Sequence, residues 1–241
     1  MNFATIKTAC SSCNLRELCL PVGLSQSELE QLDELVYVHR RCKRNTCLYC
    51  VGDRFDAIYA VRTGFFKTCL GHEDGQMQVM GFHMAGEIIG LDGINTDRYT
   101  CDAVALEDSE VCVIPYPRFE EISHQVQALQ HHFSKILSRE IEQDHRAMLL
   151  LGSMRAEERL AAFLLNLSQR FAARGYSANE FNLRMTREEI GSYLGLTLES
   201  VSRLFSKFHE DRLLSVRNKQ IRITNPHGLQ QLSGHAQGRA A

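Results

Sequence analysis

The sequence of 241 residues lacks the features of membrane-spanning and secreted proteins. It contains no run of about 18 apolar residues, the length that a membrane-spanning helix needs. Its first residues, MNFATIKTACSSCN, include no apolar segment like that of a secretory signal peptide. We therefore expect a protein that makes no membrane contact and stays in the cytoplasm.

Catalytic and repetitive patterns are missing as well. We find no glycine fingerprint for nucleotide binding, no catalytic triad, no internal repeat and no low-complexity tract. The composition, with 44% apolar and 23% charged residues, is that of a soluble globular protein. The chain is long enough for one large domain or two ordinary ones, and nothing in it predicts an enzyme.

Cysteine is abundant, with nine residues in the chain. An odd number of cysteines and a reducing cytoplasm both argue against a disulfide framework. Metal binding is the better explanation for the clustered ones. The nine are Cys10, Cys13, Cys19, Cys42, Cys47, Cys50, Cys69, Cys101 and Cys112.

Charge is unevenly distributed along the chain. Residues 1–151 carry 14 Lys and Arg against 21 Asp and Glu, a net charge of −7. Residues 152–241 carry 13 against 8, a net charge of +5. A basic C-terminal part suits a polyanionic partner such as nucleic acid, although chance variation of a surface gives the same asymmetry.

The N-terminal half predicts a Cys-rich leader over residues 1–23, followed by a β domain over 24–118. Ser25 and Glu28 form a capping-box pair that opens a short helix. Between residues 40 and 116, β-branched and aromatic runs alternate with glycine turns, among them Thr63-Gly64, Asp74-Gly75 and Ala85-Gly86. This spacing predicts an all-β sandwich or jelly roll.

A helical period begins after Pro117. Residues 119–151 predict one helix of about 50 Å, with apolar positions that repeat in steps of four and three. This is the spacing of a coiled-coil seam and predicts a homodimer. Ile141 and Met148 lie in the seam, and Asp144 occupies the apolar position between them. Gly152-Ser153 then marks the start of a last domain, residues 152–241, which opens with a second helix ending near Gly175.

Residues 186–208, TREEIGSYLGLTLESVSRLFSKF, have the pattern of a helix-turn-helix. Thr186 and Glu189 cap the first helix, and Gly191 allows close packing of two helices. Gly195 lies at the turn, and Val201 is the buried residue of the second helix.

The exposed face of the second helix carries Glu199, Ser202 and Arg203. Arginine can bind guanine through O6 and N7, and glutamate can accept from cytosine N4. The segment LLSVRNKQIRIT that follows predicts a hairpin turning at Asn218-Lys219, which would serve as a wing over the phosphates. These features predict binding to double-stranded DNA rather than an ordinary helical hairpin.

Two groups of cysteines could hold a metal centre. Cys10, Cys13 and Cys19 lie in an irregular leader that can wrap around a soft metal, with a fourth ligand from elsewhere. Cys42-x4-Cys47-x2-Cys50 matches a ferredoxin spacing. Because alternate residues of a strand point to opposite faces, we expect Cys47 and Cys50 not to converge and to be at least half-buried. Cys69 and Cys101 are expected to be small core residues.

The chain resembles the CRP/FNR superfamily of regulators, and specifically its oxygen-responsive FNR branch, from about Cys10 to Gly234. The motifs that carry the resemblance are CSSCNLRELCLP, GDRFDAIYAVRTG, GFHMAGEIIGLD, LEDSEVCVIP, AEERLAAFLLNLSQRF and IGSYLGLTLESVSRLF. It implies an α+β architecture: a double-stranded β-helix (jelly roll), a long dimerisation helix over 119–151, and a winged helix-turn-helix.

The resemblance also implies a [4Fe-4S] cluster held by Cys10, Cys13, Cys19 and Cys112. It implies recognition of palindromic TTGAT-type sites, and contact with RNA polymerase by an activator. It argues against a cyclic nucleotide, because the nucleotide-binding positions of CRP-like proteins correspond to Leu91 and Tyr99-Thr100 here, without the arginine that binds the phosphate. Asn14 departs from the best-known FNR sequence, which has serine there.

These features combine into one hypothesis, a switch in the dimer seam. Two Asp144 carboxylates that face each other would repel and lose hydration, which favours the monomer. An intact cluster would favour the DNA-binding dimer, and oxygen would remove that bias. The alternatives are a zinc-binding or thiol-based redox regulator of the same fold and, from another class, an iron–sulfur electron-transfer protein.

Overall fold

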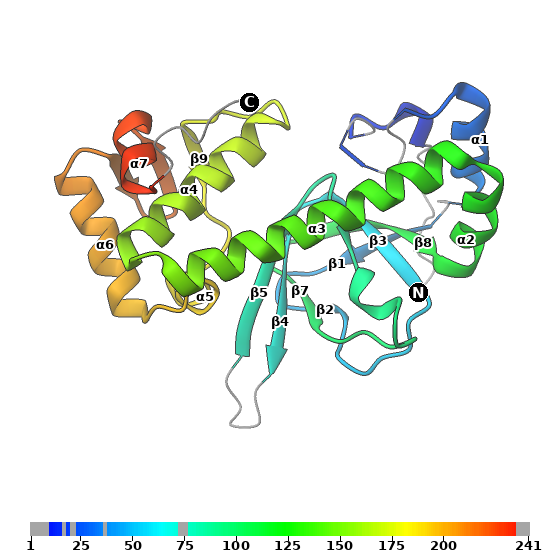
Figure 1. Cartoon of the computed structure of the whole chain (residues 1–241), viewed down its shortest axis with the longest axis horizontal. Coiled ribbons are helices and arrows are strands. Elements are labelled where there is room, and N and C mark those ends of the chain that lie inside the picture. Colours follow the sequence, from blue (N-terminus) through cyan, green and yellow to red (C-terminus); the bar gives the residue numbers. More distant parts are fainter. Residues whose placement is uncertain (1–9, 16–17, 20–22, 36–37, 72–76, 235–241) are drawn as a thin grey trace. The chain divides into compact units, whose positions relative to one another are not determined.

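The computed structural model describes residues 10–15, 18–19, 23–35, 38–71 and 77–234 (Figure 1). The chain divides into two compact units, residues 1–142 and 143–241. The expected turn at Asp74-Gly75 lies outside the described residues. Across the described part of the chain, no helix combines the length and the apolarity needed to cross a membrane.

The first α-helix of unit 1, α1 (Gln26–Leu35), begins as the capping pattern predicts. The Glu28 carboxylate accepts from the Ser25 backbone N–H at 2.7 Å, and the Glu28 N–H donates to the Ser25 hydroxyl at 3.4 Å. Leu29 and Leu32 of this helix are buried, so its apolar face packs into the unit.

Two four-stranded antiparallel sheets form the body of unit 1, in the orders β1-β8-β3-β6 and β2-β7-β4-β5. Strand β3 is buried along most of its length, as expected for a strand inside a sandwich. Both sheets contribute to one core. The predicted jelly roll is confirmed. The strands are β1 (Val38–Cys42), β2 (Cys47–Tyr49), β3 (Ala57–Thr63), β4 (Phe65–Gly71), β5 (Met77–Met84), β6 (Ile88–Ile89), β7 (Asp102–Ala105) and β8 (Ser109–Pro115).

The long helix differs from the prediction. Instead of one helix over 119–151, the structure has α2 (Tyr116–Gln125) and α3 (Gln127–Ser153), separated at Val126. Val126 has φ −108° and ψ 89° and is buried. The break lets Phe119 of α2 and Leu129 of α3 both reach the core, and the Phe119 and Phe133 rings lie 4.7 Å apart. Burial of these large side chains outweighs one lost helical turn, and no proline or glycine marks the break in the sequence.

Unit 2 contains the predicted helix-turn-helix and hairpin, with a third strand and a last helix that the sequence analysis did not predict. The three-stranded sheet has the order β10-β11-β9. Leu160, Leu164, Val201 and Phe208 are buried in this unit. Its elements are α4 (Ala156–Ala172), β9 (Glu180–Asn182), α5 (Arg187–Leu194), α6 (Leu198–Glu210), β10 (Leu214–Arg217), β11 (Gln220–Ile223) and α7 (Pro226–Leu232).

Candidate metal centre and nucleic-acid interface

Hydrogen bonds at Ser11 and Cys19 fix the described part of the cysteine leader to the helices of unit 1. Cys10 begins a short 3-10 turn, η1 (Cys10–Ser12). The Ser11 N–H and hydroxyl both donate to the Asp33 carboxylate on α1, at 3.2 and 2.7 Å. Further along, the His132 ring on α3 lies 3.2 Å from the Cys19 carbonyl oxygen. The leader is therefore held at one side by α1 and at the other by α3.

Cys112 belongs to the sheet. It lies on β8, with His39 of β1 and Ala60 of β3 as its cross-strand partners. Cys10, Cys19 and Cys112 are all partly buried against the core of unit 1. Cysteines from two segments about a hundred residues apart in the sequence thus pack against the same core.

Electrostatics links the four thiols. Burial raises the pKa of Cys10 well above its usual range, and neighbouring acidic groups raise it further. These groups are Cys19, Cys112, Asp33 and Cys13. Burial raises the pKa of Cys112 to about 11, with Cys13 as the next cause.

The chemistry of these donors suits a cationic metal centre, but in the described part of the chain their side chains are not arranged as a formed site. Several thiols and a carboxylate in a partly buried site cannot all ionise unless positive charge compensates them, and thiolates are soft ligands. Among the residues that the structure describes, no three His, Cys, Asp or Glu side chains are placed closely enough to share one metal ion.

A polar network that the sequence analysis missed lies beside Cys112. His39 and Glu110 project from the same sheet face as Cys112, since His39 is its cross-strand partner and Glu110 is two residues away. Burial, followed by the charge of Arg62, lowers the pKa of His39. The His39 Nδ1 lies 3.1 Å from the Arg62 guanidinium and 3.2 Å from Glu110 Oε1.

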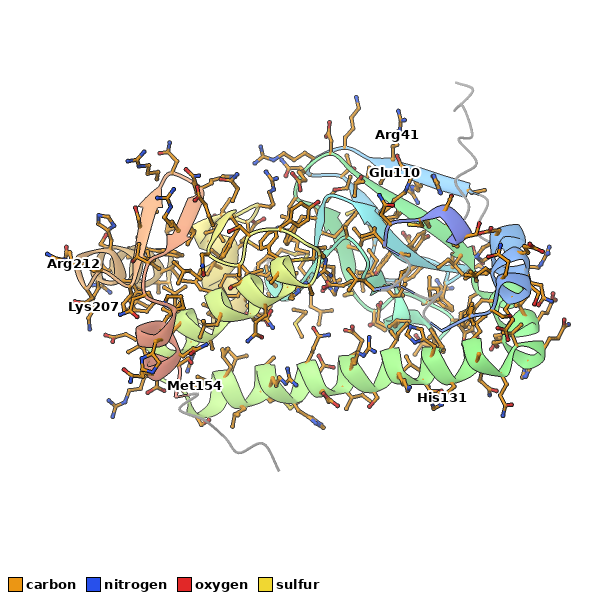
Figure 2. All side chains as sticks on the ribbon, turned by 90° about the horizontal axis from the view of Figure 1, so that it is seen from above. Arg41, Glu110, His131, Met154, Lys207 and Arg212 are labelled. Atoms are coloured by element: carbon orange, nitrogen blue, oxygen red, sulfur yellow. The ribbon has the colours of Figure 1, made fainter. Side chains whose placement is uncertain are left out.

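Glu110 joins this network to the arginines around it. Its carboxylate pairs with Arg62, and the Arg41 Nε lies 3.6 Å from Glu110 Oε2. Figure 2 shows Arg41 and Glu110 near each other on the sheet. The sequence contained a signal for this network. Glu110 lies two positions before Cys112 on β8, so the two side chains share one face of the strand.

The second cysteine group does not behave as expected. Cys42 is buried at the end of β1, but Cys47 is exposed and Cys50 half-buried. The thiols of Cys47 and Cys50 share a hydrogen bond. The prediction that they diverge is wrong, because a β-bulge between Cys47 and Tyr49 breaks the alternation. Cys69 and Cys101 are buried, as predicted.

In unit 2, α5 and α6 form the predicted helix-turn-helix. The Glu189 carboxylate accepts from the Thr186 N–H at 2.7 Å, and the Glu189 N–H donates to Thr186 Oγ1 at 3.1 Å. Gly195 ends α5 with φ +63°, a conformation that favours glycine. A Cβ atom on Gly191 would lie 2.6 Å from the Leu196 carbonyl oxygen, so only glycine fits there.

The second helix of the motif separates a buried and an exposed face. Val201, Phe205 and Phe208 are buried, and Leu204 is half-buried. On the other side Glu199, Ser202 and Arg203 are all exposed, as predicted. The Arg203 guanidinium donates to Ser200 Oγ at 3.3 Å, within the same helix. These three side chains are free of the core and available to a partner.

Two further elements support this surface. Arg187 lies over the Phe205 ring, 3.3 Å from its centroid, and burial lowers its pKa to about 10. The sequence analysis did not single out this contact, which joins the two helices. The β10–β11 hairpin turns at Asn218, with φ +55°, and Lys219, as predicted for a wing.

The predicted seam residues form an exposed stripe on α3. Ile141 and Met148 are 55% and 69% exposed, and Asp144 between them is exposed too. Leu149 and Leu151 are also exposed large apolar residues of this helix. Such a stripe is unusual for a chain on its own and is available for association.

Two family models match the chain. The Crp-like helix-turn-helix domain matches residues 158–232, and the cyclic nucleotide-binding domain matches residues 39–125.

Whole-chain comparisons agree. The chain is 52% identical to the transcriptional regulatory protein btr of Bordetella pertussis, over 93% of each chain. It is 42% identical to the fumarate and nitrate reduction regulatory protein of Escherichia coli, over 94% of this chain and 90% of the other. Among solved structures, FixK2 from Bradyrhizobium japonicum has 28% identity and a TM-score of 0.76, covering 85% and 98% of the two chains.

The close approach at Gly191 generates a stability prediction. Gly191→Ala should destabilise unit 2 by about 1–3 kcal/mol, because the new methyl group meets backbone rather than a flexible side chain. Gly152→Ala is the matched control, since Gly152 is also helical but has no heavy atom within 4 Å of a built Cβ. Thermal unfolding followed by circular dichroism measures both. Equal midpoints for the two variants would show that the turn tolerates a side chain.

Proposed function

Since the chain belongs to the FNR-type transcription regulators of the CRP/FNR superfamily, we propose that it senses oxygen through a [4Fe-4S] cluster and binds DNA as a homodimer. It is a regulator with a DNA-binding helix-turn-helix and not an enzyme. The cluster ligands, the DNA sequence and the dimer switch are the proposed parts. RNA polymerase is the expected partner of such an activator.

One observation carries the proposal: Cys10 and Cys112 are partly buried against one core, and other cysteines of the proposed set are among the causes that raise the pKa of each. Four cysteine thiolates are the usual ligands of an iron–sulfur cluster. We assign Cys10, Cys13, Cys19 and Cys112 as these ligands. When bound, the cluster would supply the oxygen-reactive chemistry. The role of the protein is to provide the thiolates, and to shield them behind α1 and the sheet.

The contacts of the leader give a route from this site to α3. The Cys19 carbonyl oxygen contacts His132 on α3, and Ser11 is held by Asp33 on α1. A leader ordered around a metal centre would keep both contacts, and a leader released from it would strain or lose them. The proposed signal is thus a change in how firmly the first turns of α3 are held.

Further along α3, the stripe of Ile141, Asp144 and Met148 would form the dimer seam. Apolar residues there favour association, whereas paired Asp144 carboxylates oppose it through repulsion and desolvation. Because these two contributions to the free energy of association oppose each other, a small further stabilisation of the dimer would shift the monomer–dimer equilibrium. Dimerisation would set two α6 helices one turn of DNA apart, as a palindromic TTGAT-type site requires.

The pattern of hydrogen bonds around Asp92 supports a sensor that does not bind a cyclic nucleotide. Asp92 Oδ2 accepts from the Thr100 N–H at 2.7 Å and from the Thr100 hydroxyl at 3.1 Å. Tyr99 is buried, with its ring centroid 3.9 Å from that of Tyr49. Where CRP-like proteins bind a phosphate, this chain thus places a carboxylate on the local donors. A phosphate there would meet repulsion rather than an arginine.

The first prediction concerns the ligands. Anaerobically purified protein should contain four irons and four sulfides and absorb in the visible range. Replacing Cys10, Cys13, Cys19 or Cys112 with Ala should abolish that absorption, because each contributes one thiolate. Cys47→Ala is the matched control and should keep the full iron content. Zinc in place of iron would replace this proposal with a zinc regulator. Loss of iron in Cys47→Ala, with retention in Cys10→Ala, would show that the cluster is held by the second cysteine group instead of the leader.

The second prediction concerns DNA reading. Arg203→Ala should weaken binding to a TTGAT-type palindrome by about 1–3 kcal/mol and relax discrimination at the guanine. Fluorescence anisotropy with the site, single-base variants and random DNA measures both effects. Ser206→Ala, an exposed change one turn further along α6, is the control. An equal loss on random DNA would assign Arg203 to a phosphate instead.

The third prediction concerns the seam. Asp144→Ala should dimerise and bind DNA in air without a cluster, because repulsion and carboxylate desolvation are removed together. Sedimentation of the aerobic variant measures its oligomeric state. Glu142→Ala is the control, since it removes a carboxylate from the same helix two residues away from the seam position. An Asp144→Ala protein that remains monomeric where the anaerobic wild type is dimeric would disprove the switch.

A further inference from the structure

The Cys47–Cys50 pair is a thiol site that the proposed function does not use. Cys47 begins β2, and Cys50 directly follows that strand. The register between β2 and β7 shifts between Cys47 and Tyr49, so the regular alternation of side chains is interrupted there. They share a hydrogen bond, while Cys47 is exposed and Cys50 half-buried. The pair is thus preformed and can be reached from solvent.

The surroundings of the pair oppose its ionisation. Burial raises the pKa of Cys47 to about 12, followed by the hydrogen bond with Cys50. The electrostatic effects of Cys50, Asp102 and Cys69 add to that shift. Asp102 is the cross-strand partner of Cys69, and its Oδ1 accepts from the Val51 N–H at 2.7 Å. A group that brings positive charge to the two sulfurs would offset these effects.

We propose that Cys47 and Cys50 form a second metal site, separate from the leader cysteines, which binds one soft, thiophilic ion of low coordination number such as Cu(I). Two sulfur–metal bonds form and the two thiol protons are released to solvent. No electron is transferred. Asp102 contributes through its charge and not as a ligand.

Geometry favours a bridging ion over a disulfide. A disulfide needs Cα atoms within about 7 Å and sulfurs bonded at about 2.05 Å. Two metal–sulfur bonds of about 2.3 Å each can join sulfurs up to about 4.6 Å apart. A pair of hydrogen-bonded thiols in a bulged strand matches the longer span.

The number of donors selects the class of ion. Structural zinc sites take four protein ligands, whereas thiolates are preferred by Cu(I), which is satisfied by few of them. Within the described ranges, no set of three His, Cys, Asp or Glu side chains lies close enough for one ion, and an ion held by two thiolates needs no third.

The test is an anaerobic Cu(I) titration of the full-length protein with its iron loaded, in competition with a chromophoric Cu(I) chelator. Wild type should bind one equivalent of Cu(I) that Cys47→Ser and Cys50→Ser do not bind. Cys42→Ser is the matched control, since Cys42 belongs to the same sequence triplet but is buried at the end of β1. It should bind as wild type does. Iron content and thermal midpoint, measured throughout, report an intact protein.

Other outcomes would overturn the site. Retention of the full equivalent by Cys47→Ser and Cys50→Ser would do so, as would an equal loss in Cys42→Ser. Mass spectrometry after treatment with glutathione disulfide adds an independent check. A Cys47–Cys50 disulfide in that experiment would replace the metal site with a redox pair. The comparison does not depend on the leader site, because the one-equivalent difference is expected whether or not iron is bound there.

Discussion

The cost of ionising Cys10 among other acidic groups is the constraint on which unit 1 depends. A thiolate there would meet Asp33 and, as they ionise, three other cysteines, in a place already partly removed from water. Charges a few ångströms apart at low dielectric interact by several kcal/mol. The leader therefore cannot become a set of four thiolates unless a cation compensates it. In the proposed cluster site, metal binding and the order of the leader would consequently be parts of one equilibrium.

The same constraint explains why the leader is attached to two helices. Asp33 accepts both hydrogen bonds from Ser11, and it is among the groups that raise the pKa of Cys10. Helix α1 therefore fixes the turn at Cys10 and also disfavours the ionised form of the Cys10 thiol. His132 approaches the Cys19 carbonyl oxygen from α3, and its pKa is lowered mainly by burial. A neutral imidazole can donate that bond without adding a buried charge. The contact from the leader to α3 therefore costs little desolvation, and it depends mainly on where the Cys19 backbone lies.

How much the sequence could predict differs between the two units, for a physical reason. The helix-turn-helix is specified locally, because the cap at Thr186, the close approach at Gly191 and the turn at Gly195 each depend on neighbours within a few residues. The break at Val126 depends on core packing of Phe119 and Leu129, which no local pattern expresses.

The cysteine sites divide along the same line. The three leader cysteines are close in sequence, so their spacing alone indicates a metal-binding group. Cys112 could be assigned only through family resemblance. The Cys47–Cys50 contact was predicted wrongly, because alternation in a strand holds only while the ladder is regular. A bulge adds a residue without any distinctive composition, so a rule based on period two fails at this pair.

The exposed stripe on α3 completes the energetic argument. Apolar area removed from water contributes about 25 cal/mol per Å², so Ile141 and Met148, both more than half exposed, would favour a seam. A buried carboxylate without a partner opposes it by an amount of similar size. Each 1.4 kcal/mol of difference changes an equilibrium constant tenfold. In the proposed dimer, a few kcal/mol supplied by an ordered leader would then move the population from mostly monomer to mostly dimer. A seam made only of apolar residues would remain closed whatever the state of the cysteines, so Asp144 would be what makes the equilibrium adjustable.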